Sequence, residues 1–266
     1  LTQVLAPAII AIERGFDAVG EWLMGFSNPI TDFLAGAVWL VRRTLLPTGS
    51  DVGFLGSAAC VETKDCSGQD LTGVDLVGQD LSGVNFTGAT LRLADLRATN
   101  MAQTNLTDAN AAAANLVGSN LVAALLVGTN LSNANLNNVD LSGRNISGGN
   151  LSGANLRGVK LDNANLTDAN LAGVNFTLLS GWSGANMTRA NFVGATLSLQ
   201  MMNLVLREAN LSGVDLTMVN FTGSDLSGAN LTNSRLRLGK FVNANLSNVD
   251  FTVARFERGG MFPAFT

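Results

Sequence analysis

The chain has 266 residues, with 16 basic and 20 acidic side chains, a formal charge of −4 and no histidine. A charged fraction of 14% with 47% hydrophobic residues is typical of a folded chain and excludes an intrinsically disordered one. Because histidine is the usual general base and metal ligand, we expect no catalysis, no metal and no other cofactor. The chain starts at Leu1, which predicts that a preceding segment was removed by processing or by choice of the expressed segment.

The first fifty residues have a helical hydrophobic period. Apolar residues over Leu1–Phe26 recur at three- and four-residue steps, which predicts an amphipathic helix. The sequence SNP at Ser27–Pro29 ends this helix and begins a second one over about 30–46. We therefore expect a helical hairpin over 1–50 that caps the next domain or, alternatively, lies on a membrane surface. Its uncharged stretches are shorter than the ~20 apolar residues of a transmembrane span.

A linker with a disulfide loop is expected over residues 51–66. This segment contains both cysteines of the chain, Cys60 and Cys66, in the sequence CVETKDC. Two neighbouring cysteines in a chain otherwise free of cysteine predict a local disulfide, formed in an oxidising compartment. A zinc site would need four ligands, and the chain has no histidine to complete one.

From residue 67 to 258 an apolar residue, here called the centre, returns at every fifth position. Neither a helix nor a strand keeps such residues on one face. The centres run without a shift over Leu71–Phe176 and again over Leu206–Phe256. Three centres between these runs are displaced by one residue: Met187, Phe192 and Leu197. Since 25 of the 36 centres are leucine and 7 are phenylalanine, the chain must bend once per repeat to keep them inward.

Each centre has a small residue two positions before it and Asn or Asp directly before it, as in GANLRGVKLDNANLTDANLAGVNF at Gly153–Phe176. This pattern resembles the pentapeptide-repeat family, whose unit is A(D/N)LXX. The resemblance covers residues 66–258 and implies an all-β solenoid, a right-handed quadrilateral β-helix with four repeats per coil. The expected architecture is this solenoid over 67–258, preceded by the α-helical hairpin and followed by an apolar tail over 259–266.

The solenoid core predicts a protein without an active site. A core filled by leucine, phenylalanine and alanine leaves no cavity for a substrate. Arg144 stands where the repeat has a small inward residue, and we expect its side chain to reach solvent through a local widening of the coil. A bound anion at Arg144 is the alternative.

The repeat is shifted twice, by an extra residue within Leu178–Gly184 and by a missing residue before Leu206. One interpretation is a pair of bulges that restore the frame. The alternative is a docking patch of exposed apolar side chains: Trp182, Met201 and Met202.

Charge is uneven along the repeat. Residues 51–80 carry six acidic side chains and one lysine, whereas residues 231–260 carry five basic and two acidic ones. The basic candidates for an interaction surface are Arg235, Arg237 and Arg255, of which Arg235 and Arg255 should stack on one face. In the tail, Phe262 and Phe265 are expected to cap the last coil or to form a dimer contact.

The stretch LVRRTLLPTGSDVGF, over 40–54, resembles a segment after the leader of exported proteins of mycobacteria and related actinobacteria. That resemblance implies an exported protein, in the cell envelope or outside the cell.

Three functions remain open from the sequence. The first is a non-catalytic exported structural or interaction protein with an unknown protein partner, which self-assembles through its ends or hairpin. The second is a DNA-mimicking gyrase-binding protein, as the family resemblance implies for some members. Residues 67–260 carry 13 acidic and 12 basic side chains, which is poor mimicry of DNA. The third is a scaffold held at the membrane surface by the hairpin. No nucleic-acid partner and no transmembrane span are expected.

Overall fold

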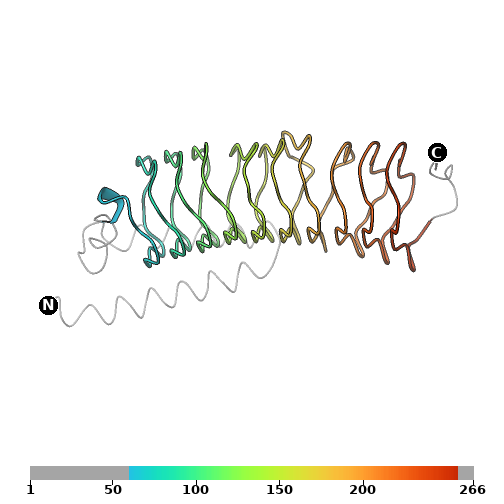
Figure 1. Cartoon of the computed structure of the whole chain (residues 1–266), viewed down its shortest axis with the longest axis horizontal. Coiled ribbons are helices and arrows are strands. Elements are labelled where there is room, and N and C mark those ends of the chain that lie inside the picture. Colours follow the sequence, from blue (N-terminus) through green and yellow to red (C-terminus); the bar gives the residue numbers. More distant parts are fainter. Residues whose placement is uncertain (1–59, 257–266) are drawn as a thin grey trace, which may run out of the picture. The chain divides into compact units, whose positions relative to one another are not determined.

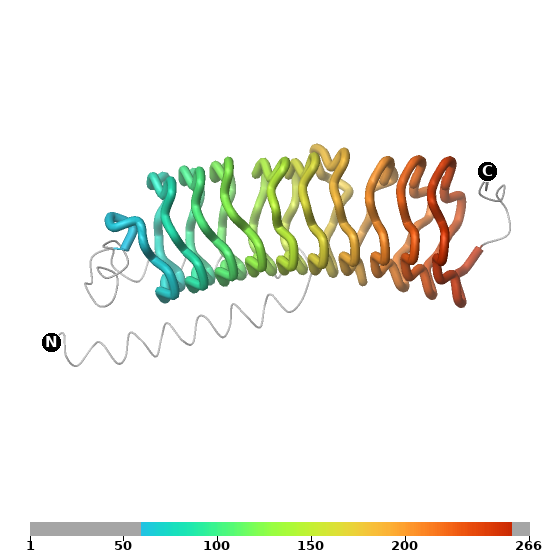
Figure 2. The backbone as a smooth tube through the Cα atoms, viewed as in Figure 1, coloured from blue at the N-terminus to red at the C-terminus, as the bar shows by residue number. Residues whose placement is uncertain are grey.

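The repeat region forms a stack of coils. In this computed structural model the chain divides into two compact units, Leu1–Ala59 and Cys60–Thr266, and the structure describes residues 60–256. Parallel bridges join residues twenty positions apart, as in Asp65 with Asn85, so each coil takes twenty residues. The coils follow one another along one axis (Figures 1 and 2). The predicted hairpin and apolar tail lie outside the described residues.

Each coil has four sides, and one backbone bridge per side joins most neighbouring coils. In the first coil the bridging residues are Asp65, Asp70, Asp75 and Asp80, and they define the first to the fourth side in this order. The bridges stay isolated because the chain turns again after every one. The one helical turn within the described residues spans 60–62, before the first coil. The predicted four-sided solenoid of five-residue repeats is confirmed.

The centres fill the interior. The centres of four successive sides are fully buried: Leu81, Phe86, Leu91 and Leu96. The small residues two positions before a centre are buried as well: Val84, Ala89 and Ala94. Buried side chains of this kind form one hydrophobic cluster over the repeat region. Since full burial of a leucine or phenylalanine contributes about 1.5–3 kcal/mol, this column supplies most of the stability.

The corners of the coils need a left-handed backbone. The second residue after a centre has a positive φ, as at Gly78 (φ 70) and Asn138 (φ 60). Glycine and asparagine adopt this conformation at little cost, which explains their frequency at these positions. Leucine and methionine do so less readily, yet Met218 (φ 63) and Leu238 (φ 56) occupy two corners.

The Asn or Asp before each centre joins the turn to the neighbouring coil. Oδ1 of Asn170 accepts a hydrogen bond from the backbone N–H of Ala172 (3.2 Å) and another from Nδ2 of Asn191 in the next coil (3.1 Å). Nδ2 of Asn170 in turn donates to Oδ1 of Asn150 (3.1 Å). Because a carboxamide both donates and accepts, asparagine can repeat along the stack without adding charge.

The two shifts of the repeat are absorbed within the coil stack. Bridges join residues 21 positions apart at Lys160–Gly181 and 19 apart at Asn186–Val205, and the spacing returns to 20 at Gln200–Asn220. One coil therefore has an extra residue and the next lacks one. This result supports the interpretation as a pair of frame-restoring bulges.

Arg144 lies at an interruption of the bridges. Its side chain is half-buried, and its Nε donates to the carbonyl oxygen of Ser142 (3.2 Å). In this part of the described stack no bridge joins Asn120 to Asp140 or Leu125 to Asn145, although the coils before and after are bridged on both sides. A long side chain in a slot sized for alanine separates the two coils, which agrees with the expected local widening.

Candidate interaction surfaces

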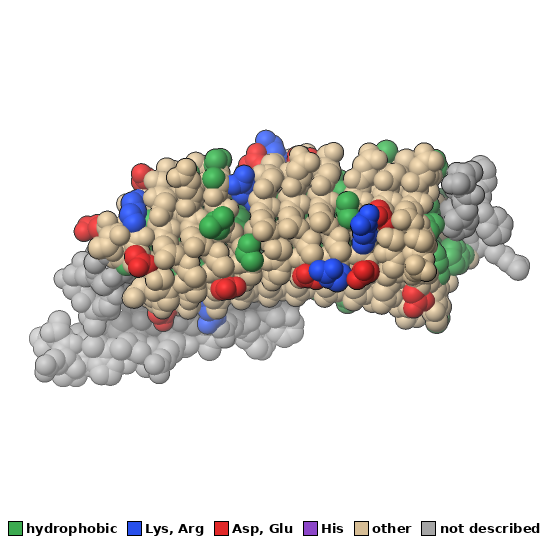
Figure 3. Space-filling view, viewed as in Figure 1, with side chains coloured by type: hydrophobic (Ala, Val, Ile, Leu, Met, Phe, Trp, Pro, Cys, Tyr) green, Lys and Arg blue, Asp and Glu red, His purple; other side chains and the backbone are tan. Residues whose placement is uncertain are grey.

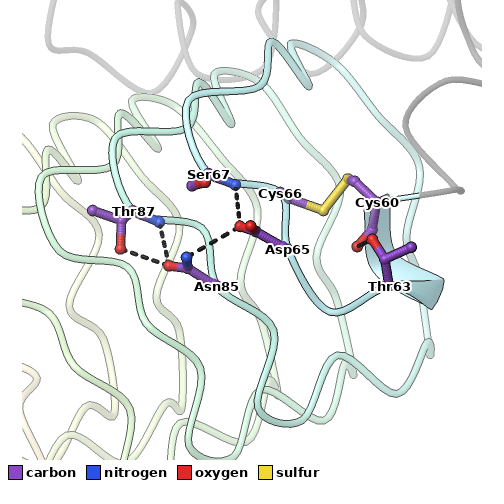
Figure 4. The surroundings of a disulfide bond; sticks show 7 residues. All are labelled: Cys60, Thr63, Asp65, Cys66, Ser67, Asn85 and Thr87. Atoms are coloured by element: carbon purple, nitrogen blue, oxygen red, sulfur yellow. Dashed lines mark hydrogen bonds between the residues drawn. A yellow bond between two sulfur atoms is a disulfide. The ribbon is translucent and has the colours of Figure 1, made fainter.

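The first candidate feature is the disulfide at the start of the solenoid, where Cys60 and Cys66 are bonded (Figure 4). Cys66 is fully buried at a centre position, whereas Cys60 packs against the core from the helical turn. The backbone N–H of Asp65 donates to the carbonyl oxygen of Cys60 (3.0 Å). The predicted disulfide is present, and it ties the turn at 60–62 to the first centre of the core.

The first coil carries an acidic ring. Asp65, Asp70, Asp75 and Asp80 are all exposed, one on each side. Hydrogen bonds from the hydroxyl and backbone N–H of Ser67 lower the pKa of Asp65, and those from Ser82 lower the pKa of Asp80. Both carboxylates are therefore charged at neutral pH.

The last described coils carry a basic cluster. Arg235 and Arg255 bridge to each other on the third side, as predicted, and both are exposed. Arg237 and Lys240 lie on the same coil as Arg235, around the edge between the third and fourth sides. Asp215 forms an ion pair with Arg235 (3.6 Å). We call Arg235, Arg237, Lys240 and Arg255 the basic cluster.

Met201 is a correction to the predicted docking patch. Its side chain is fully buried, and its backbone N–H donates to the carbonyl oxygen of Asn220 (2.8 Å), as centres on this side do. Met201 is therefore the centre of the fourth side after the missing residue, and it cannot line a docking surface. Met202 is 37% exposed at the following corner.

Trp182 takes the equivalent centre position one coil earlier. Its ring stacks on Phe176 with 5.9 Å between the ring centroids, and its side chain is half-buried against the core. The indole is too large for the interior of one coil, which leaves its rim at the surface. The proposed patch of Trp182, Met201 and Met202 thus loses its central member. Phe262 and Phe265 lie outside the described residues.

Sequence analysis missed an apolar edge at the corner between the third and fourth sides. Four residues on successive coils are between 44% and 55% exposed there: Leu178, Leu199, Met218 and Leu238. The frame shift hides this alignment in the sequence, because the steps between them are 21, 19 and 20 residues. We call these four residues the apolar edge. The sides themselves are mainly uncharged polar, as the face in Figure 3 shows.

A metal-binding cluster or a membrane-spanning helix would be a further kind of functional site among the described residues. Within residues 60–256 no group of three acidic, cysteine or histidine side chains could hold a metal ion. Over the same residues, the structure contains no helix with the length and apolarity of a membrane span.

Comparison with protein families identifies the repeat. The family described as pentapeptide repeats matches in 8 copies, over residues 65–97, 104–143, 145–177 and 200–237, together more than half of the chain. No curated protein matches the sequence significantly.

Several solved structures are similar in part. HetL, a pentapeptide repeat protein of heterocyst differentiation regulation in the cyanobacterium Nostoc, is 23% identical, with a TM-score of 0.38 over 76% of this chain and 93% of HetL. Full-length QnrB1, a plasmid-mediated fluoroquinolone resistance protein, is 16% identical, with a TM-score of 0.38 over 73% of this chain and 94% of QnrB1. A pentapeptide repeat protein of the Arabidopsis thaliana thylakoid lumen is 31% identical, with a TM-score of 0.21 over 46% of this chain and 70% of that protein. The family assignment rests on the repeat matches and not on these superpositions.

Proposed function

Because this chain belongs to the pentapeptide-repeat family, we propose that it is an exported, non-catalytic interaction protein of the cell envelope, and that it pairs with copies of itself. The observation that carries this proposal is the separation of charge along a solenoid with a filled core. The acidic ring lies on the first coil and the basic cluster on the last described coils, eight or more coils away. Over the described residues the molecule offers surface and charge to a partner, and its core is filled by side chains and not by a substrate cavity.

The separated charges favour pairing of two copies in opposite directions. In an antiparallel pair related by a two-fold axis, the acidic end of each copy faces the basic end of the other. On the third side this arrangement places Asp75 opposite Arg255 and Asp95 opposite Arg235, and the bridging positions from Asn115 to Thr196 between them are uncharged and polar. The two-fold axis repeats every contact between the acidic end of one copy and the basic end of the other. Both ends of both copies are then occupied, so the pair closes and does not grow into a polymer. Head-to-tail stacking is the open alternative.

Light scattering of the full chain tests self-association. We expect a dimer mass at low salt that falls toward the monomer mass as salt increases, because exposed charges are screened. The variant Arg235→Glu/Arg255→Glu should be monomeric at low salt. The control is Arg207→Glu, a charge reversal next to the first side and away from the third side, which should keep the dimer mass. A monomer mass for the wild type at every concentration and salt would refute self-association.

The disulfide supports the export part of the proposal, because cysteine pairs of this kind persist in oxidising compartments. The test is fractionation of the native cell, followed by thiol alkylation and intact-mass measurement of the recovered protein. We expect the protein in the envelope or medium, with two alkyl groups added only after reduction. Protein recovered from the cytoplasm with two free thiols would refute export.

A further inference from the structure

The apolar edge combines features that a solvent-exposed corner does not need. Its four aliphatic side chains follow one another over successive coils, which at ~4.8 Å per coil makes a line of ~14 Å. Single exposed leucines are ordinary, but a row of four on one convex edge is not.

Two members of the edge are also placed against local backbone preference. Met218 and Leu238 have φ values of 63° and 56°, in the left-handed region. At the same corner of earlier coils this position is occupied by small or turn-forming residues with positive φ: Gly78, Ala98, Gly118, Asn138 and Gly158. A large apolar side chain here is less favourable than glycine or asparagine and gains no burial in return. Val253 has the same combination at another corner (φ 59, 67% exposed), so the apolar edge differs from the other corners by its row of four residues and by the charges beside it.

The basic cluster surrounds the C-terminal part of the edge. Arg237 directly precedes Leu238 in the chain, and the bridging positions of the third and fourth sides on that coil are Arg235 and Lys240. These two positions lie in the middle of their sides, so they are set back from the corner residue Leu238, which projects furthest from the axis of the solenoid. At the other end of the rod the same corner lies between Asp75 and Asp80. Within the described residues, the apolar edge has cations at both ends, with the basic cluster beside Leu238 and with Arg157 and Lys160 one coil before Leu178.

We propose that the apolar edge and the basic cluster together bind the surface of an anionic lipid bilayer. With the rod lying along the bilayer, the edge enters the boundary between acyl chains and headgroups. The third and fourth sides then slope away from the bilayer and hold the basic cluster at the level of the lipid phosphates. Convex aliphatic residues next to Lys and Arg suit this surface, which needs no complementary groove.

A second copy is a poorer occupant of the apolar edge. If two edges paired in antiparallel fashion, with Leu199 against Met218, the coil with Arg157 would face the coil with Arg255. Like charges would then meet on both sides of the contact. The bilayer contact uses Arg255, which the proposed antiparallel pairing places opposite Asp75 of the second copy, so the two contacts compete for the third side. The test must separate the bilayer contact from this pairing and from the hairpin expected over residues 1–50.

Co-sedimentation of the full chain with vesicles tests the proposal. We expect binding to vesicles of phosphatidylcholine and phosphatidylglycerol in equal parts, and weak binding to phosphatidylcholine alone. The informative variant is Met218→Asn/Leu238→Asn, because asparagine suits the left-handed corner and should leave the fold intact. It should bind the anionic vesicles at least tenfold more weakly. The matched control is Val253→Asn, at the same turn position (φ 59) but at the corner between the second and third sides; it should bind like the wild type.

A second variant tests the charges. Lys240→Gln/Arg255→Gln should weaken binding to the anionic vesicles about 25-fold and reduce its dependence on salt. The proposal is overturned if the wild type binds neither kind of vesicle, which would favour a protein partner for the edge. It is equally overturned if Met218→Asn/Leu238→Asn binds like the wild type, because the hairpin would then account for the binding. Circular dichroism of every variant shows whether the solenoid has folded.

Discussion

Nδ2 of Asn191 donates a hydrogen bond of 3.1 Å to Oδ1 of Asn170, which stands 21 residues earlier in the chain and one coil earlier in space. Nδ2 of Asn170 donates an equivalent hydrogen bond to Oδ1 of Asn150, one coil earlier still. The ladder continues across the coil that carries the extra residue. Side-chain bonds of this kind therefore hold the coils in register even where the repeat is shifted.

Asn170→Ala is expected to remove the turn bond to Ala172 and both ladder bonds of Asn170. The matched control is Asn175→Ala, which removes two turn bonds from Thr177, one from its backbone N–H (2.9 Å) and one from its hydroxyl (2.7 Å), at a position where the bridge to the preceding coil is absent. We expect Asn170→Ala to lower the free energy of unfolding by about 1–2 kcal/mol more than Asn175→Ala. Denaturant unfolding measures both values. Equal losses would mean that the ladder adds nothing to the turn.

Leu156→Asp should unfold the rod or divide it at the centre of its third side. Leu156 is 1% exposed, so a carboxylate there would be buried without a partner, at a cost of several kcal/mol. Leu156→Met keeps the volume and should cost less than about 1.5 kcal/mol. Thermal unfolding followed by circular dichroism compares the two. A melting temperature for Leu156→Asp equal to that of the wild type would exclude the inward position of Leu156.

Arg144→Ala is expected to close the widened coil. Alanine fills the corresponding slot one coil before and after, at Ala124 and Ala164, which are both buried. Removing the long side chain should let the backbone N–H groups of Leu121 and Leu126 bond to the next coil. Hydrogen exchange at these two amides should then slow, and the free energy of unfolding should rise by about 1 kcal/mol. Unchanged exchange would show that Arg144 does not cause the interruption.

Reduction of the disulfide should loosen the first coil and leave the remaining coils folded. The bond joins residues six positions apart, and closing so short a loop contributes about 2 kcal/mol in the chain-entropy model. Hydrogen exchange with and without reductant should show faster exchange at Asp65 and Cys66 and no change at Leu206. Cys60→Ala should behave like the reduced protein. Loss of protection along the whole rod would instead make the disulfide a requirement for folding.

The turn aspartates predict loss of stability in acid. Hydrogen bonds from Ser82, Ser142 and Thr252, led in each case by the side chain, lower the pKa of Asp80, Asp140 and Asp250. A carboxylate with a depressed pKa in the folded state stabilises the fold above the unfolded value, near ~4, and this contribution is lost as the pH falls through the folded value. The melting temperature should therefore stay level from neutral pH to about 5 and fall below about 4.

The variant Asp80→Asn/Asp140→Asn/Asp250→Asn is the control for this acid effect. Asparagine accepts the same turn bond, as Asn85 does from Thr87 (3.1 Å), but does not titrate. Its melting temperature should fall less steeply below pH 4 than that of the wild type. Parallel curves for the two proteins would assign the acid sensitivity to other groups.

The sequence alone determined the repeat, its inward face and the stacking of Arg235 on Arg255. The reason is that a five-residue period is a local property. Every repeat has its own turn, its own small residue and its own centre, so each repeat specifies the same backbone geometry independently of the others. The pairing of Cys60 with Cys66 is local in the same sense, since the two lie only six residues apart in the chain.

Where the repeat shifts, only the tertiary structure decided which side chains face inward. Leu178–Gly184 and the segment before Leu206 could each take up a changed length at several points, and the sequence left Met201 as a surface candidate. Contact with the coils on either side selected one register, in which Met201 is a buried centre and Trp182 stacks on Phe176. The apolar edge has the same origin, because its residues align only after steps of 21, 19 and 20. A local period cannot encode such alignment between coils, because the alignment depends on which residues of adjacent coils are paired by backbone bridges.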